Sequence, residues 1–531
     1  MRPVVYSDHG PVLSTFALPI AHPTRPIQHR GDPVCLIIPP SGFLLDERVF
    51  MSLGILRVAA SLEQAGVPVE LLDLSGIENY NAVAEQHLRA SHARTVALTS
   101  TTPHLPAAVQ LAQTIRAARP DARLILGGPH VTLVHSAVKL EKKSGRTARA
   151  HAAWKRLAEH FDVLVAGDGE RAIFEALRSD APSFIDADDP NGGLFMDDDT
   201  YDETPFPARH LVDVGSYHYA IDGHRATSLI AQLGCPFGCG FCGGRNSKSL
   251  RLIRTRSTAS IIRELELLYK TYGFTGFMFY DDELNVSPSM VELMNAIADL
   301  QMRLGVEFRL RGFVKAELFT DAQAEAMYRA GFRWLLCGFE AAAPQILLNI
   351  NKKATLDDNN RAMEHARRRG LKVKALMSIG HPGESEESVR AVHDWLLEAR
   401  PDDFDCTVIT TYPGTPYYDE ALPHPTLPEV WTYSCARSGD RLHALEVDFT
   451  RVADYYKGDP DGGYHAYVFT DALSSEELVR LRGWVENDVR TKLAIPFNAS
   501  KQAIRYEHSM GQGLNTLPPF VLRSSAFKPN G

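Results

Sequence analysis

The chain has 531 residues, of which 44% are hydrophobic and 23% are charged, and its formal net charge is −9. This composition is typical of folded soluble domains and excludes a wholly disordered chain, and the length allows two to four domains with separate cores. The mild negative charge argues against a surface that coats nucleic acid, so we expect no nucleic-acid partner.

Targeting and redox signals are also limited. No run of about eighteen apolar residues occurs, and the N-terminal stretch has no basic segment followed by an apolar core. We therefore expect a cytoplasmic protein without a membrane segment. The seven irregularly spaced cysteines do not suggest a disulfide framework, so their thiols are available to bind metal.

After an N-terminal extension at 1–31, the chain alternates short strands with helices. Helices are predicted at 52–66 and 105–120. Five apolar runs predict strands, at 33–39, 67–75, 95–101, 122–128 and 161–170. This alternation predicts a parallel sheet in a doubly wound, Rossmann-like domain over 32–180, with ligands beyond the carboxyl ends of its strands.

A second α/β unit is predicted over 225–420, after a linker at 181–224 that is rich in Asp, Pro and Gly. Six strand candidates begin near residues 228, 276, 307, 333, 372 and 404. They fit a (β/α)6 partial barrel of the TIM type, whose chemistry gathers at the carboxyl ends of the strands. The remainder, 421–531, reads as a mixed C-terminal region with one clear helix at 474–490.

Three cysteines lie together in the glycine-rich stretch GCPFGCGFCGG at 234–244, directly after the first predicted barrel strand. They are Cys235, Cys239 and Cys242, and thiolates at such spacings suit zinc or an iron–sulfur cluster. A four-iron cluster held by three thiolates leaves one iron open for a substrate or cofactor.

Structural zinc needs a fourth cysteine or histidine. Cys35, Cys337 and Cys406 lie in apolar strand patterns typical of core residues, and Cys435 gives no signal. The histidines that keep zinc open as an alternative are His210, His218 and His224.

The segment CPFGCGFC (235–242) resembles the CxxxCxxC motif of the radical S-adenosylmethionine (radical SAM) superfamily, which has an aromatic residue before the third cysteine. Strand-end segments are similar to those of the branch with an N-terminal cobalamin-binding domain: GFE (338–340), MSIGHPGES (377–385) and TYPGTPYYD (411–419). The front half is similar to that branch at ILGGPH (125–130), VAGDGE (165–170) and TPFPARHLVD (204–213). The resemblance covers about residues 33–420.

The resemblance implies that the three cysteines hold a [4Fe-4S] cluster whose open iron binds S-adenosylmethionine, the source of a 5′-deoxyadenosyl radical. Phe241 is then expected near the adenine, and Glu340, Gly380 and Gly383 near the ribose and methionine. Asp281 and Asp282 are expected to face the cofactor amine, with capping of the following helix as the alternative.

In the first domain the resemblance implies a cobalamin site. Gly127 and Gly128 would allow a bulky ligand to approach the backbone, and the residues expected to bind its polar tail are Ser100, Thr101 and Thr102. His130 and His135 are polar candidates near the ligand. The DxHxxG signature that supplies an axial histidine is absent, and PPSGFLLDE follows the first strand instead. A histidine ligand to cobalt from that loop is therefore not expected.

The segment GDGERAIFEAL, at 167–177, also fits a phosphate-binding turn, because glycines there open a helix.

These features together imply a methyltransferase that acts on an unactivated carbon or phosphorus of a small-molecule substrate, served by an external flavodoxin- or ferredoxin-type electron donor. The main alternative keeps both cofactors but performs cyclisation or rearrangement without net methyl transfer. A methylthiotransferase fits poorly, because the front domain offers only Cys35. A non-catalytic electron-transfer or zinc-binding module is a fourth reading.

The C-terminal region is expected to close the site over the substrate or to bind it, and its candidate residues are Tyr506, His508 and Met510.

Overall fold

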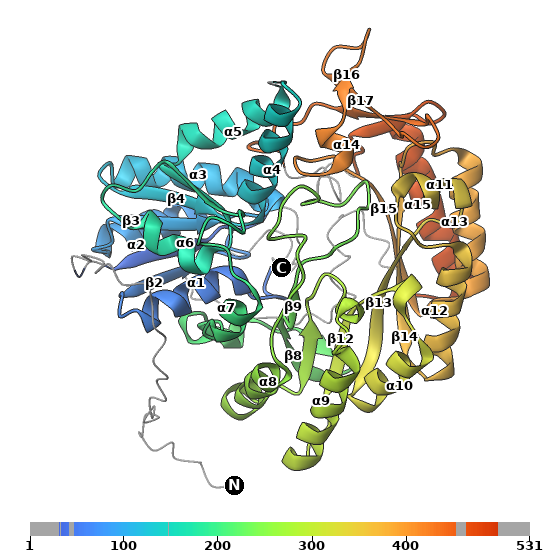
Figure 1. The fold of residues 1–531 in the computed structure, drawn as a ribbon, viewed down its shortest axis with the longest axis horizontal. Coiled ribbons are helices and arrows are strands. Elements are labelled where there is room, and N and C mark those ends of the chain that lie inside the picture. Colours follow the sequence, from blue (N-terminus) through green and yellow to red (C-terminus); the bar gives the residue numbers. More distant parts are fainter. Residues whose placement is uncertain (1–30, 32, 42–46, 147, 453–463, 497–531) are drawn as a thin grey trace, which may run out of the picture.

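The computed structural model describes residues 31–496, except 32, 42–46, 147 and 453–463. They form two α/β units side by side and a smaller antiparallel sheet next to the second unit (Figure 1). Tyr506, His508, Met510 and residues 1–30 of the expected extension lie outside the described residues. No helix within the described ranges combines the length and the apolar character needed to cross a bilayer.

The first unit is built on a six-stranded parallel sheet in the order β2-β1-β3-β4-β5-β6. Its strands are β1 (Val34–Ile38), β2 (Val69–Asp73), β3 (Thr95–Thr99), β4 (Arg123–Gly127), β5 (Val163–Gly167) and β6 (Phe184–Ala187). One face is covered by α1 (Leu53–Gln64) and α6 (Gly169–Ala176). The other face is covered by α2 (Tyr80–Ala90), α3 (Leu105–Ala118), α4 (Pro129–Lys143) and α5 (Arg149–His160). The strand order reverses between β1 and β3, which confirms the doubly wound prediction.

The first sheet extends beyond the boundary expected at residue 180. β6 pairs in parallel with β5, so the sheet has six strands instead of the expected five and ends inside the predicted linker. α7 (Asp198–Glu203) follows. A four-residue strand is too short to show alternation, and its Asp- and Gly-rich flanks predict a loop.

The second unit is a curled seven-stranded sheet in the order β15-β14-β13-β12-β11-β8-β7. Six strands are parallel, as predicted: β8 (His224–Leu229), β11 (Gly276–Phe279), β12 (Arg309–Lys315), β13 (Phe332–Glu340), β14 (Lys372–Ile379) and β15 (Asp403–Val408). The antiparallel edge strand β7 (Ala220–Ile221) is an addition that the sequence did not predict. Helices accompany the strands: α8 (Thr258–Tyr272), α9 (Met290–Leu304), α10 (Asp321–Arg329), α11 (Pro344–Ile350), α12 (Leu356–Arg368) and α13 (Glu386–Ala399).

The C-terminal region covers one side of this open barrel. Its four-stranded antiparallel sheet consists of β16 (Leu422–Pro423), β17 (Val430–Ser434), β18 (Arg441–Leu445) and β19 (Val468–Thr470). The predicted helix is α15 (Ser475–Leu493), which starts with a capping box at Ser474 and packs against β15 and α13. Two further short elements are α14 (Pro416–Asp419) and the antiparallel pair β9 (Gln232–Leu233) and β10 (Arg254–Thr255).

A buried ion triad fixes the predicted linker to the barrel. Arg209 of the linker donates to one carboxylate oxygen of Glu264 on α8, at 2.7 Å, and Arg256 donates to the other. Arg209 also donates to the carbonyl of Ser228 on β8, at 2.8 Å. Burial opposes the charge of Glu264, but the two guanidinium groups prevail and hold its pKa at about 2. The segment before the barrel is therefore part of the barrel's core.

We expect Glu264→Gln to lower the free energy of unfolding by about 3–5 kcal/mol, because it leaves two buried arginines without their counter-charge. The melting temperature reports this loss. Since the pKa of Glu264 falls from its usual 4.5 to about 2 on folding, the difference between wild type and variant should narrow as the pH falls from 4.5 towards 2. Glu266→Gln, at a more exposed position of the same helix, is the control and should change little.

Candidate functional site

The three predicted cluster ligands lie on a loop between β9 and β10, at the carboxyl end of β8. Two carboxylates that follow β11 hold the start of this loop. Asp281 accepts hydrogen bonds from the backbone N–H groups of Ala231, at 3.0 Å, and of Gln232, and Asp282 accepts one from Gly234. Neither aspartate caps α9, which begins at Met290, so the capping alternative is wrong.

These carboxyl groups have unusual acidity. Burial raises the pKa of Asp281 to about 7 and also raises the pKa of Asp282, although the backbone N–H groups oppose the shift. The next residue, Glu283, also has a pKa raised by burial to about 7, and its Oε2 has no hydrogen-bond partner among the described residues. Three acidic groups whose pKa is raised by burial thus lie at one strand end, close to the cysteine loop.

The middle of the loop packs against the last barrel segments. Gly240 donates to the carbonyl of Ile350, at 2.7 Å, and accepts from the backbone N–H of Tyr417, at 3.1 Å. A Cβ atom at Gly240 would lie 2.3 Å from the Tyr417 ring, so only glycine fits there. The glycines between the cysteines therefore allow the loop to lie directly on Tyr417.

The first domain closes over the same loop. A Cβ atom at Gly243 would lie 3.1 Å from the side chain of Leu133 on α4, and a Cβ atom at Gly414 would lie 2.8 Å from it. Gly244 donates to the carbonyl of Gly414, at 3.0 Å. Because α4 starts at the carboxyl end of β4, the expected cobalamin edge of the first sheet faces the cysteines.

Further contacts fix this arrangement of the two domains. Asp188, directly after β6, accepts from the hydroxyls of Ser247 and Ser249, at 2.6 and 2.7 Å, just after the cysteines. Asp168 forms a buried ion pair with Arg254, at 2.5 Å. Each of these contacts joins the first domain to the segment that carries or follows the cysteine loop.

Two buried lysines lie beside the loop, and the sequence did not single them out. The Nζ of Lys315 lies 4.1 Å from the centre of the ring of Phe237, a residue between the first two cysteines in the sequence. Lys352 forms an ion pair with Glu340 at 3.2 Å. Burial raises the pKa of the Cys239 thiol, while the positive charges of Lys352 and Lys315 act against this shift. Positive charge beside a cysteine stabilises the thiolate that a metal requires. A lysine at the end of an apolar strand was the available signal for Lys315.

The residues expected to hold S-adenosylmethionine converge on the carboxyl ends of the barrel strands. Phe241 meets the ring of His381 edge to face at 5.5 Å, and Glu340 ends β13. Gly380 and Gly383 both adopt positive φ, at 89° and 81°. Gly383 also makes room for the carboxylate of Asp440, which would lie 2.8 Å from a Cβ atom there. Their contacts with the cofactor stay a prediction.

The predicted cobalamin residues lie at the carboxyl ends of β3 and β4, but their polar side chains already bond to partners within the first domain. Ser100 donates from its hydroxyl to the carbonyl of Thr101, and the hydroxyl of Thr101 pairs with His104. Thr102 pairs with the Nδ1 of His130 at 3.0 Å, and burial lowers the pKa of His130 to about 4.

The two glycines of this edge differ in what they adjoin. Gly128, at φ +98°, lies against the chain itself, because a Cβ atom there would be 2.8 Å from the backbone nitrogen of Ser100. Gly127 has only ordinary contacts, 3.9 Å or more from Val165. Of the two, Gly127 better fits the expected approach of a ligand.

The zinc alternative finds no support from its three histidines. His224 begins β8 and therefore lies at the opposite end of the strand from the cysteines, where it bonds to Thr275 at 3.0 Å. His210 pairs with Glu63, and His218 with the carbonyl of Ser216. Cys337 and Cys406 are buried, as predicted, and Cys435 is buried too.

Two other features lie away from the cysteine loop. Donor atoms of Cys35, Glu70 and His87 lie within 4.8 Å of one another, but His87 is already paired with Glu70 at 3.0 Å.

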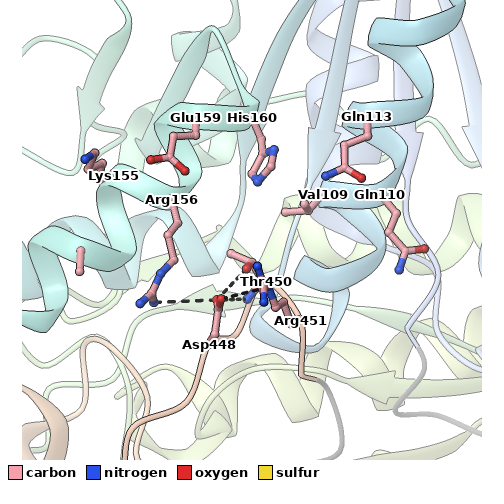
Figure 2. A pocket seen from close by; sticks show the side chains of 11 residues that line it. Val109, Gln110, Gln113, Lys155, Arg156, Glu159, His160, Asp448, Thr450 and Arg451 are labelled. Carbon is pink, nitrogen blue, oxygen red and sulfur yellow. Dashed lines mark hydrogen bonds and ion pairs between the residues drawn. The ribbon is translucent and has the colours of Figure 1, made fainter. Parts of the chain in front are cut away.

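A cavity of about 640 Å³ opens between α3, α5 and the segment around Asp448. Figure 2 shows Asp448 engaged there with Arg156, Thr450 and Arg451. None of the predicted cofactor-binding residues lines this cavity.

The family of the chain follows from two domain matches that agree with this geometry. The family model described as the radical SAM superfamily matches residues 229–396, and the model described as the B12 binding domain matches residues 47–146. The chain belongs to the radical SAM superfamily. It represents the branch in which a B12-binding domain precedes the radical SAM domain.

Similar radical SAM proteins include methylases and cyclases. The chain is 25% identical over 341 residues to an uncharacterized methyltransferase of Pyrococcus horikoshii, which is 62% of this chain and 69% of that protein. It is 25% identical over 391 residues to the hopanoid C-3 methylase of Methylococcus capsulatus, covering 70% and 69%. An anaerobic magnesium-protoporphyrin IX monomethyl ester cyclase of Cereibacter sphaeroides is also 25% identical, but the match spans only 55% of its length.

A solved radical SAM structure has the same fold. It is the methyltransferase TsrM from Kitasatospora setae, with cobalamin and a [4Fe-4S] cluster bound. The TM-score is 0.62 at 18% identity, and the match covers 86% of this chain and 91% of that one. The two domain matches, and not this likeness in fold, assign the cofactors of this chain: a [4Fe-4S] cluster and S-adenosylmethionine to the radical SAM domain, and cobalamin to the B12-binding domain. One loop carries three of the seven cysteines and no fourth. Three thiol ligands fit a four-iron cluster in which one iron stays open.

Gly240→Ala should prevent stable cluster assembly, because its methyl group would collide with Tyr417 and displace the loop between the cysteines. Iron content and brown absorbance after anaerobic reconstitution measure this. Gly238→Ala, in the same loop, is the control, because the nearest atom there is the side-chain nitrogen of Asn351 at 3.2 Å. Equal iron content in the two variants would show that the contact with Tyr417 does not shape the loop.

Proposed function

We propose that the protein is a cobalamin-dependent radical SAM methyltransferase that methylates an unactivated carbon or phosphorus of a small-molecule substrate. The observation that carries this proposal is the contact of Leu133 with Gly243 and Gly414, because it supports a cobalamin edge of the first sheet that faces the cysteine loop. When bound, S-adenosylmethionine at a reduced cluster supplies a 5′-deoxyadenosyl radical and cobalamin supplies a methyl group. A substrate between the two sites can meet both, and proximity is what such transfer needs.

Residue roles follow from position in the site. We assign Cys235, Cys239 and Cys242 to the cluster, and Phe241, Asp282, Glu340, Gly380 and Gly383 to S-adenosylmethionine. Asp281 positions the loop through the N–H groups of Ala231 and Gln232. In the first domain we assign Gly127 to direct approach of cobalamin, while Ser100, Thr101, Gly128 and His130 shape the edge on which it lies.

The names of the relatives support methyl transfer more than the alternative. Similar proteins include a hopanoid C-3 methylase and a cytidylyl-2-hydroxyethylphosphonate methyltransferase of Streptomyces wedmorensis, whose names indicate carbon and phosphonate substrates. Two similar proteins are named cyclases, so cyclisation without net methyl transfer is the second candidate.

The partners and setting are proposed on chemical grounds. Reduction of the cluster calls for a low-potential donor, and we propose a flavodoxin- or ferredoxin-type protein. The seven described cysteines are all free thiols, which supports a reducing cytoplasmic setting. The net charge of −9 supports a small-molecule substrate over nucleic acid.

Cys239→Ala should abolish both the brown cluster absorbance and the release of 5′-deoxyadenosine, because the cluster would lose one of its three protein ligands. Reconstitution with iron and sulfide under anaerobic conditions, followed by reduction with S-adenosylmethionine present, measures both. Cys435→Ala, at a buried cysteine directly after β17, is the control and should retain both signals. Nucleoside release from Cys239→Ala at the wild-type rate would refute the assignment.

Methyl transfer can be separated from cyclisation with S-adenosylmethionine labelled in its methyl group. We expect the label to appear in a product when candidate metabolites are screened with the wild type. A product that forms with nucleoside release but without label would favour the cyclase reading instead.

A further inference from the structure

The carboxylate expected to hold S-adenosylmethionine sits on a strained backbone. Glu340 has φ +65°, in the left-handed region, and the pairing of β13 with β14 shifts register between Gly338 and Glu340. A Cβ atom at Gly338 would lie 2.4 Å from Oε1 of Glu340, so the carboxylate turns back over its own strand. A non-glycine residue keeps this conformation only where its surroundings impose it, and such residues cluster at functional sites.

Two hydrogen bonds fix the two oxygens of this carboxylate. The Nζ of Lys352 donates to Oε1 at 3.2 Å, and the hydroxyl of Ser378 on β14 donates to Oε2 at 3.1 Å. The Oγ of Ser378 in turn lies 2.8 Å from Nε2 of His381, in the turn that follows the strand. The chain of contacts therefore runs from His381 through Ser378 to Glu340.

The direction of each hydrogen bond in this chain is determined by chemistry. The carboxylate only accepts, so the single hydroxyl hydrogen of Ser378 goes to Glu340 and the serine oxygen must accept from Nε2–H of His381. Burial lowers the pKa of His381 to about 3, so its imidazole is neutral and Nδ1 carries the lone pair. Nδ1 is buried and has no hydrogen-bond partner among the described residues.

The ring of His381 is itself fixed from both sides. It is fully buried and meets Phe241 of the cysteine loop edge to face at 5.5 Å and Tyr417 at 6.2 Å. The backbone N–H groups of Gly380 and His381 both donate to Glu384, at 3.1 and 3.4 Å, which holds the turn. The imidazole thus has one orientation, in which only Nε2 reaches the serine.

We propose that His381 is a positioning residue that orients the carboxylate of Glu340 through Ser378 for binding S-adenosylmethionine. This inference rests on the proposed function, in which Glu340 contacts that cofactor. Without the Nε2–H donor, the Ser378 hydroxyl can turn away from Glu340, and one carboxylate oxygen then loses its fixed partner.

The test compares His381→Leu, His381→Gln, Ser378→Ala and the double variant His381→Leu/Ser378→Ala as reconstituted holoenzymes. Equilibrium dialysis gives the Kd for S-adenosylmethionine, and the change in the electron paramagnetic resonance of the reduced cluster on adding it gives an independent readout. We expect His381→Leu and Ser378→Ala each to raise the Kd about tenfold, the scale of one hydrogen bond to a charged group. The double variant should be no weaker than either single variant, because both break the same chain.

Two comparisons separate positioning from a merely structural role. The glutamine amide carries an N–H where Nε2 lies, so His381→Gln should return the Kd to within about threefold of wild type. His393→Leu removes a comparably buried histidine from α13, which stacks on Trp484 and bonds to Asp488. It should lower the melting temperature and leave the Kd unchanged.

The possible failures are distinguishable. If the wild type binds S-adenosylmethionine and His381→Leu and Ser378→Ala bind it equally well with full iron content, the positioning role is refuted while the proposed function stands. It is also refuted if His381→Gln is as weak as His381→Leu, since the donor is then not what matters. If the wild type itself holds no cluster or does not bind the cofactor, the proposed function fails and the positioning role fails with it.

Discussion

The position of the cysteine loop is the constraint on which the rest of the site depends. A loop with five glycines in eleven residues has little conformational preference of its own, so its shape must come from its neighbours. Asp281 and Asp282 hold its start through backbone N–H groups, Tyr417 supports its middle, and Leu133 covers its end. Contacts from the strand ends, the last barrel segment and the first domain thus together define the position of the cysteine loop.

Buried charges of opposite sign surround this loop. Lys315 and Lys352 are buried cations, and the acidic groups nearby are Glu283, Glu317 and Glu340. Buried charges persist only when they are paired, and here the pairing falls at the strand ends instead of in the core. The same ammonium group of Lys352 that moderates the pKa of Cys239 also orients Glu340. One buried ammonium group therefore acts on both the Cys239 thiol and the Glu340 carboxylate.

Much of the fold and the central part of the site could be predicted from the sequence. Apolar runs with helical partners predicted the six parallel barrel strands, and the structure confirms them. The spacing of Cys235, Cys239 and Cys242 predicts the cluster loop, and the structure places this loop at the carboxyl ends of the barrel strands. Periodicity could not reveal β6, because four residues are too few to show alternation. It also could not show that Asp188 and Arg209, both in a segment that reads as a linker, bond to the barrel over long sequence distances. The lysines and His381 were missed for a related reason, since their roles depend on partners from other strands.

Arg149 of α5 ties the first domain to the C-terminal side of the barrel. Its guanidinium lies 3.5 Å from the centre of the Tyr418 ring and 4.6 Å from that of Trp431, and it donates to the Tyr418 carbonyl at 2.6 Å. Swinging the two halves apart would expose these aromatic faces and break that bond, along with the Asp168–Arg254 pair. The first domain and the barrel are therefore joined by a buried cation–aromatic contact and a buried ion pair, and both oppose a hinge motion between the two halves.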